Sequence, residues 1–170
     1  MRHITLITTG GTIEKTYDEQ TGELVNRGSI VRRMLGRLRL ENVHITTMEL
    51  LNKDSLYMTD DDRATIVQAA RAAQDVSDAV VILHGTDTLT LTGDLLAAQI
   101  TTPRVPIVLT GAMRPFEMKR SDALQNLTES IFAAGTLSPA VYCVAHGRAL
   151  KFPGVKKDRA NGTFVAVAAG

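Results

Sequence analysis

The sequence predicts an α/β fold with a mostly parallel sheet that has helices on both faces. Short runs of aliphatic and β-branched residues alternate along the chain with segments of helical periodicity, which is the pattern of repeated β-α units. The chain has 170 residues, a common size for one domain, and shows no internal repeat or low-complexity linker. We therefore expect a single domain over residues 1–170.

The strands are expected at apolar runs that have the length and composition of buried β-structure. Most of these runs lead into glycine, proline or small polar residues, where a strand would stop. The expected strands cover residues 3–9, 43–48, 79–84, 105–110 and 139–145, and a last strand covers residues 164–168.

Helices are expected in the gaps between these strands. Ser29 and Thr59 have the side chains that cap helix N-termini, and the three aspartates after Thr59 suit the positive end of a helix dipole better than a metal site. The expected helices cover residues 29–38, 59–74 and 92–100, and a fourth starts at 121–122 and carries Leu124, Leu127 and Ile131 on one face.

Two polar segments lack a regular hydrophobic pattern. Residues 14–26 contain Thr21-Gly22 and are predicted to form a hairpin or a mobile flap. Residues 151–162 are basic, contain Pro153-Gly154 and are predicted to form a loop. Both segments lie beside strand ends, where loops carry function.

Composition argues against several classes of partner. The 19 basic and 18 acidic residues leave a formal net charge of +1, and only 4% of residues are aromatic, so nucleic acid is not an expected partner. The apolar runs are too short to span a bilayer, and residues 1–3 lead into a strand rather than an export signal. We therefore expect a cytoplasmic protein with no membrane partner, in which Cys143 is a buried and inert thiol.

Motifs for common cofactors and metals are missing. Residues 10–16 superficially resemble a phosphate loop, but Glu14 stands where that motif requires glycine. The dinucleotide fingerprint and the serine-hydrolase elbow are absent, and the four histidines have no metal-ligand spacing. Neither a metal nor a cofactor is expected, and His84 is expected to pack or hydrogen-bond rather than act as a base.

Polar side chains gather where the first four expected strands end, which is where open parallel sheets bind ligands. Thr12 follows the first strand on a glycine-rich turn, a placement that suggests a nucleophile, although such turns also occur without chemistry. The other groups at this edge are Asn52, Ser55, Thr86, Asp87 and the turn at 110–115, and a lysine is available from residues 151–157. The mixture fits proton transfer and the binding of a small polar molecule.

Three blocks in this order resemble the bacterial-type L-asparaginases, and the similarity spans nearly the whole chain. The blocks are Thr9-Gly10-Gly11-Thr12-Ile13, His84-Gly85-Thr86-Asp87-Thr88 and Gly111-Ala112-Met113-Arg114-Pro115. The resemblance implies the flavodoxin-like, three-layer fold of the family's N-terminal domain and hydrolysis of L-asparagine to L-aspartate and ammonia without a cofactor. We expect the family's usual second domain to be absent and a dimer or tetramer of the chain to close the pocket.

The resemblance also implies roles for individual residues. Thr12 corresponds to the nucleophile, and Tyr17 on the flap corresponds to the tyrosine that activates or orients it. Thr86, Asp87 and Lys157 correspond to the family's second triad, in which the threonine is alternatively the attacking group or the holder of the water. Both roles for the two threonines stay open.

The remaining assignments concern the lysine and the substrate. Counting back from residues 160–162 points to Lys157, and Lys156 stays an alternative. Ser55 lies in a segment that resembles the one presenting a serine to the substrate carboxylate, and Asp87 would hold the substrate ammonium. Backbone N–H groups near Gly11-Thr12 and Ala112 would stabilise the oxyanion.

The sequence departs from the family pattern next to these residues. Leu56 and Tyr57 replace the usual glutamine and acid after Ser55, and residues 116–120 are more charged than the common serine-rich version. Substrate contacts at these positions are therefore expected to differ from those of the family.

Three other functions stay open beside L-asparagine hydrolysis: a glutaminase, the ammonia-producing subunit of a transfer-RNA amidotransferase, and a non-catalytic amino-acid-binding module. The preference between asparagine and glutamine is not readable, because one methylene changes binding by only about 1–3 kcal/mol.

Overall fold

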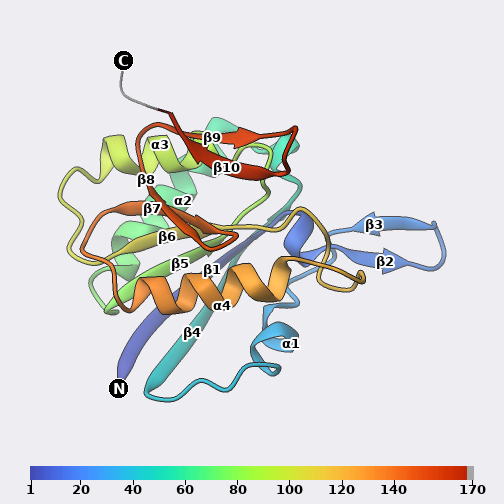
Figure 1. The fold of residues 1–170 in the computed structure, drawn as a ribbon, viewed down its shortest axis with the longest axis horizontal. Coiled ribbons are helices and arrows are strands. Elements are labelled where there is room, and N and C mark those ends of the chain that lie inside the picture. The colour runs from blue at the N-terminus through green and yellow to red at the C-terminus, as the bar shows by residue number, and fades with distance from the viewer. Residues whose placement is uncertain (168–170) are drawn as a thin grey trace.

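The computed structural model describes residues 1–167 and confirms the α/β class. Six strands form one sheet in the order β4-β1-β5-β6-β7-β8, in which the first five strands are parallel and β8 runs antiparallel to β7 (Figure 1). The strands are β1 (Arg2–Gly10), β4 (Val43–Lys53), β5 (Ala79–Leu83), β6 (Ile107–Thr110), β7 (Val141–Ala145) and β8 (Arg148–Lys151).

Four helices cover the two faces of this sheet, and two short 3-10 helices follow β1 and β4. They are α1 (Val31–Leu35), α2 (Asp60–Ala73), α3 (Leu89–Gln99), α4 (Ala123–Ala134), η1 (Thr12–Glu14) and η2 (Ser55–Tyr57). Side chains alternate along β5, so Ile82 packs with α2 and α3 while Val81 packs with α1 and α4. Every residue of β5 and β6 is buried, which explains why both sequences are almost entirely apolar.

Two antiparallel hairpins stand outside the main sheet. One pairs β2 (Thr16–Asp18) with β3 (Glu23–Val25) and projects from the body, which confirms the hairpin expected at 14–26 (Figure 1). The other pairs β9 (Val155–Asp158) with β10 (Thr163–Ala166). Ala168, expected in the last strand, lies outside the described residues.

The prediction of a loop at 151–162 is wrong, because β9 lies inside this segment. Val155 and Lys157 face inward on this strand while Lys156 is exposed. The alternation of inward and outward residues that marks a strand cannot be recognised in this sequence. One of the inward positions carries a lysine, and a lysine is ordinarily interpreted as a solvated charge.

Three element boundaries also differ from expectation by three residues or more. The first helix ends at Leu35 rather than 38, because Gly36 follows and the next N–H groups bond only three residues back. β4 continues from 48 to 53, since Lys53 pairs with Gly10 beyond a register shift. α3 begins at Leu89 rather than 92, directly after the turn that carries Thr86.

The other bounds lie within about two residues of those predicted. Ile30, not Ser29, directly precedes α1, although Ser29 Oγ accepts the backbone N–H of Val31 at 3.3 Å. Thr59 caps α2 and forms a capping box with Asp62, so the acidic first turn serves the helix as expected. Within residues 1–167, helices are all too short or too polar to cross a bilayer.

Candidate active site

The turns after β1, β4 and β5 pack directly against one another at the carboxyl edge of the sheet. Gly11 has φ 79°, and a Cβ added to it would lie 2.5 Å from the backbone of Gly85. A Cβ on Gly85 would in turn lie 2.5 Å from Ser55 Oγ. These contacts require glycine at both positions and bring the turns that carry Thr12, Ser55 and Thr86 into one cluster.

Lys157 reaches this cluster from β9. Its Nζ donates to Thr86 Oγ1 and to Asp87 Oδ1, each at 2.8 Å, and its side chain is only 15% exposed. The Lys157 ammonium and the guanidinium of Arg159 hold the pKa of Asp87 below its usual value, against the effect of burial. The structure thus places Lys157, and not the exposed Lys156, beside Thr86.

Arg159 is a member of the site that sequence reasoning missed. Its Nη1 donates to Asp87 Oδ1 at 2.8 Å, so this one oxygen receives both Lys157 and Arg159. Arg159 is two residues beyond Lys157, a spacing that would place both on one face of a strand. The prediction of a loop for this segment conceals that signal.

Ser55 lies buried between two turns. Its Oγ accepts the backbone N–H of Thr88 at 3.3 Å, and its carbonyl accepts the Thr88 hydroxyl at 3.0 Å. These bonds join the turn after β4 to the start of α3. Lys15, just after η1, pairs with Asp54 at 2.6 Å and so ties the Thr12 turn to the Ser55 turn.

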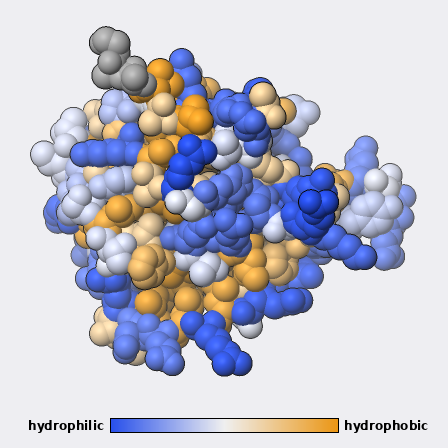
Figure 2. Space-filling view, viewed as in Figure 1, coloured by the Kyte–Doolittle hydropathy of each residue, from blue (hydrophilic) through white to orange (hydrophobic). Residues whose placement is uncertain are grey.

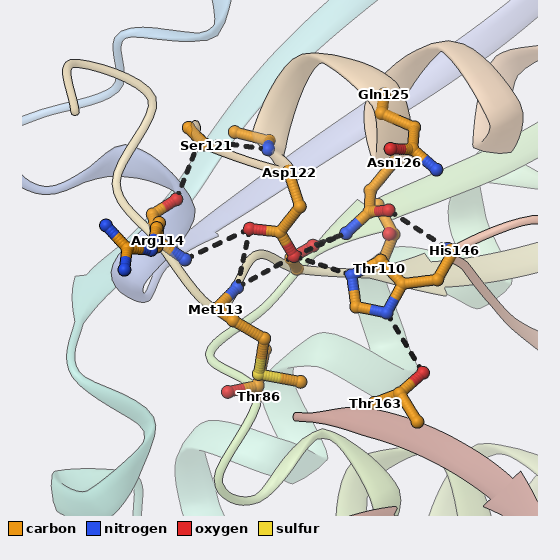
Figure 3. Close-up of polar contacts among 12 residues, drawn as sticks. Thr86, Thr110, Met113, Arg114, Ser121, Asp122, Gln125, Asn126, His146 and Thr163 are labelled. Carbon is orange, nitrogen blue, oxygen red and sulfur yellow. Dashed lines mark hydrogen bonds and ion pairs between the residues drawn. The ribbon is translucent and has the colours of Figure 1, made fainter. Parts of the chain in front are cut away.

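The turn that contains Ala112 is held by a network around Asp122 (Figure 3). The Asp122 carboxylate accepts the backbone N–H groups of Met113 and Arg114, each at 3.0 Å. It also accepts Asn126 Nδ2 at 3.1 Å and contacts His146 Nε2 at 2.7 Å. Burial opposes ionisation of Asp122, but these hydrogen bonds keep its pKa below the usual value.

Tyr17 is not brought into the cluster. Its side chain is 58% exposed, and its hydroxyl lies 3.9 Å from the position that a Cβ on Gly22 would take, at the turn of the hairpin. Its backbone N–H donates to Glu117 at 2.9 Å. The β2–β3 hairpin forms a largely hydrophilic projection (Figure 2). Because Tyr17 is exposed on this hairpin, an orienting role for it requires the flap to move.

His84 and Cys143 are buried as expected. His84 Nδ1 lies 2.8 Å from the Gly85 carbonyl, its Nε2 lies 2.8 Å from Thr92 Oγ1, and burial lowers its pKa to about 4. Burial raises the pKa of Cys143 to about 12. Neither group suits general acid–base work near neutral pH. No cluster of three or more His, Cys, Asp or Glu side chains within residues 1–167 could hold a metal.

Comparisons with known proteins identify the family of the chain. The family model described as Asparaginase, N-terminal, matches residues 3–167. The chain is 36% identical over 134 residues to an L-asparaginase of Thermococcus kodakarensis, covering 79% of this chain and 41% of that protein. It is 33% identical over 143 residues to a glutamyl-tRNA(Gln) amidotransferase subunit of Thermoplasma acidophilum, covering 79% of this chain and 33% of that protein.

Solved structures give the same picture. The thermostable L-asparaginase from Thermococcus kodakarensis superposes with a TM-score of 0.89 at 30% identity, over 99% of this chain and 52% of that chain. L-asparaginase I from Vibrio cholerae superposes with a TM-score of 0.79 at 26% identity, over 97% of this chain and 51% of that chain. The chain thus spans about half the length of these structures, and less of the curated relatives.

Proposed function

Since the chain belongs to the asparaginase family, we propose that it hydrolyses the side-chain amide of L-asparagine to L-aspartate and ammonia. The observation that carries this proposal is the contact of Lys157 Nζ with both Thr86 Oγ1 and Asp87 Oδ1. A lysine between a hydroxyl and a carboxylate can pass a proton to or from that hydroxyl.

In the proposed reaction, Thr12 Oγ1 attacks the amide carbon and forms an ester, the C–N bond breaks, and the hydroxyl proton leaves with the ammonia. Water then cleaves the ester and restores the Thr12 hydroxyl. In the alternative sequence of events, Thr86 attacks or holds the water, with Lys157 taking the proton. Positioned proton transfer of this kind is worth about 10²–10⁴ in rate.

The neighbouring groups have roles in binding and charge stabilisation. Asp87 would receive the substrate ammonium, and Ser55 would contact its carboxylate. Backbone N–H groups at Gly11-Thr12 and Ala112 would stabilise the oxyanion, each worth about 3 kcal/mol. We further propose that the enzyme is cytoplasmic and works without a cofactor. We also propose that it acts as a dimer or tetramer, because the exposed edge of one sheet cannot by itself exclude water from the reaction.

A second candidate function is production of ammonia for a transfer-RNA amidotransferase. The similarity to the Thermoplasma glutamyl-tRNA(Gln) amidotransferase protein supports it, because the sequence identity of 33% over 143 residues is close to the 36% over 134 residues shared with the asparaginase. The two candidates share the amide hydrolysis and differ in its context. Ammonia release from free asparagine supports the first candidate, and release only in the presence of an amidotransferase partner supports the second.

The test is ammonia release from asparagine and from glutamine by the full chain, its Thr12→Ala variant and its Thr86→Val variant. We expect kcat to fall at least about 10²-fold in both variants. Thr128→Val is the matched control, because Thr128 is exposed on α4 and its hydroxyl bonds, among residues 1–167, only to the carbonyl of Leu124. Undiminished turnover in both site variants would overturn the catalytic roles.

A further inference from the structure

His146 joins two parts of the molecule that meet at the proposed site (Figure 3). It lies in the turn between β7 and β8 with φ 53°, a left-handed conformation that is uncommon outside glycine. Its backbone N–H donates to Asn126 Oδ1 at 3.1 Å. Its ring contacts Asp122 Oδ2 through Nε2 at 2.7 Å and Thr163 Oγ1 through Nδ1 at 2.9 Å. The backbone N–H and both ring nitrogens of this residue are therefore used.

On one side, His146 supports the turn that contains Ala112. Asp122 receives the N–H groups of the two residues after Ala112, and Asn126 Nδ2 donates to the carbonyl of the residue before it, Gly111, at 2.8 Å. His146 bonds to both Asp122 and Asn126. The backbone on both sides of Ala112 thus depends on two side chains at the start of α4, which His146 joins.

On the other side, His146 contacts the strand that pairs with the strand of Lys157. Thr163 begins β10 and pairs with Asp158 across the hairpin, and Lys157 pairs with Phe164. Asp158, the partner of Thr163, directly follows Lys157 in the chain, so a displacement of Thr163 is passed to Lys157 through β9. Lys157 in turn donates to Thr86 and Asp87.

The chemistry of an imidazole suits this bridge. Because a carboxylate only accepts, Nε2–H of a neutral ring donates to Asp122, and Nδ1 then accepts the hydroxyl proton of Thr163. In a protonated ring Nδ1–H donates to the same hydroxyl, which also accepts. The two contacts therefore persist in either charge state, which a rigid support requires.

We infer that His146 is a positioning residue that fixes the Ala112 turn relative to Lys157. The inference rests on the proposed function, in which the oxyanion donor at Ala112 and the proton carrier at Lys157 act on the same substrate. Errors of about 1 Å in such placement cost about 10²-fold in rate. His146 has no direct part in the chemistry and acts through Asp122 and Thr163.

The test uses two single variants and their combination in the full chain. Thr163→Val keeps the shape of the side chain but removes the hydroxyl that contacts His146 and also accepts exposed Arg148 Nη2 at 3.4 Å. His146→Gln keeps one amide, which can reach Asp122 but not Thr163 as well, and leaves the Arg148 contact in place. In each variant we expect kcat for asparagine to fall about tenfold while KM changes less than about twofold, since the support matters most in the transition state. The double variant should be no slower than the slower single variant, because both break one bridge.

Thr136→Val is the matched control for the loss of a hydroxyl, because within the described part of the chain the Thr136 hydroxyl bonds only to carbonyls at the end of α4, which it follows. Unchanged kcat in both single variants, or a larger change in KM than in kcat, would overturn the positioning role.

A second readout does not depend on turnover. In ¹H–¹⁵N spectra, Thr163→Val should shift the amide resonances of Met113 and Arg114, and Thr136→Val should leave them in place. Amide resonances that stay in place in Thr163→Val would overturn the bridge even in a protein that releases no ammonia. A parent that releases no ammonia but shows these shifts would overturn the proposed function and support the bridge.

Discussion

Lys157 and Thr86 are joined side chain to side chain at 2.8 Å, although 71 positions of the chain separate them. The contact exists because the inward face of β9 lies over the turn that follows β5. Lys156 on the same strand points outward and is exposed. The two neighbouring lysines therefore form a matched pair for testing the site.

We expect Lys157→Met to lower kcat for asparagine about 10²-fold to 10⁴-fold, because the variant removes the group that we propose exchanges a proton with Thr86. Folding should persist, because Asp87 keeps its partner Arg159. Lys156→Met should leave turnover unchanged. Steady-state ammonia release measures both, and equal activity of the two variants would rule out Lys157 as the proton carrier.

Gly11→Ala should abolish activity and destabilise the protein. The new Cβ would meet the backbone of Gly85 at 2.5 Å, in a backbone conformation with φ 79° that disfavours side chains. Gly147→Ala is the control, because Gly147 also has a positive φ of 76°, but apart from its chain neighbours no atom of residues 1–167 lies within 4 Å of an added Cβ. Gly147→Ala should cost about 1 kcal/mol in free energy of unfolding. Gly11→Ala should cost about 1–3 kcal/mol more, measured by urea denaturation.

Arg159→Gln should lower KM for asparagine about two- to fivefold with little change in kcat. The exposed guanidinium shares Asp87 Oδ1 with Lys157, so it should compete for that carboxylate with the substrate ammonium that we propose Asp87 binds. An exposed ion pair is worth about 0.2–1 kcal/mol, which sets the size of the effect. A raised KM would show instead that Arg159 helps to hold the substrate.

His84 should make stability fall as the pH is lowered from about 6.5 to about 4. Burial lowers its pKa to about 4 from an ordinary value of 6.5. Between these two pH values His84 binds a proton in the unfolded chain but not in the folded chain. The loss should reach about 3 kcal/mol and be complete below pH 4.

Urea denaturation at a series of pH values, compared with the His84→Asn variant, isolates the contribution of His84. Glu14 has the opposite effect on the pH dependence of stability. Burial raises its pKa, so the folded state favours the protonated carboxyl, and this contribution to the free energy of unfolding is lost as the pH rises. Equal slopes in the parent and in His84→Asn would show that His84 accepts a proton in the folded state.

The sequence alone is informative where local backbone chemistry marks the site. Thr12 and Thr86 follow glycines at the ends of apolar strands, and such turns are visible as residue patterns. The parallel sheet then places the ends of its strands at a common edge. The position of both turns could therefore be predicted without any knowledge of contacts between distant residues.

The contacts that bring Arg159 and His146 to the candidate site could not be predicted from residue patterns. Each depends on which segments of the chain pair with which, since Arg159 reaches Asp87 only because β9 folds back over α3. His146 likewise meets Thr163 only because β10 lies beside β7 and β8. Charged and aromatic side chains of this kind look like solvated surface until the tertiary partners are known.

The projecting β2–β3 hairpin has a consequence for handling the protein. Its turn, residues 19–22, is exposed, and few contacts beyond those of Tyr17 and Asn26 tie the hairpin to the body. A protease should therefore nick this turn before any strand of the sheet. The cut would leave the main sheet intact but break the covalent link between β2 and β3. Because the proposed role of Tyr17 needs an intact flap, limited digestion should yield a compact product that releases less ammonia.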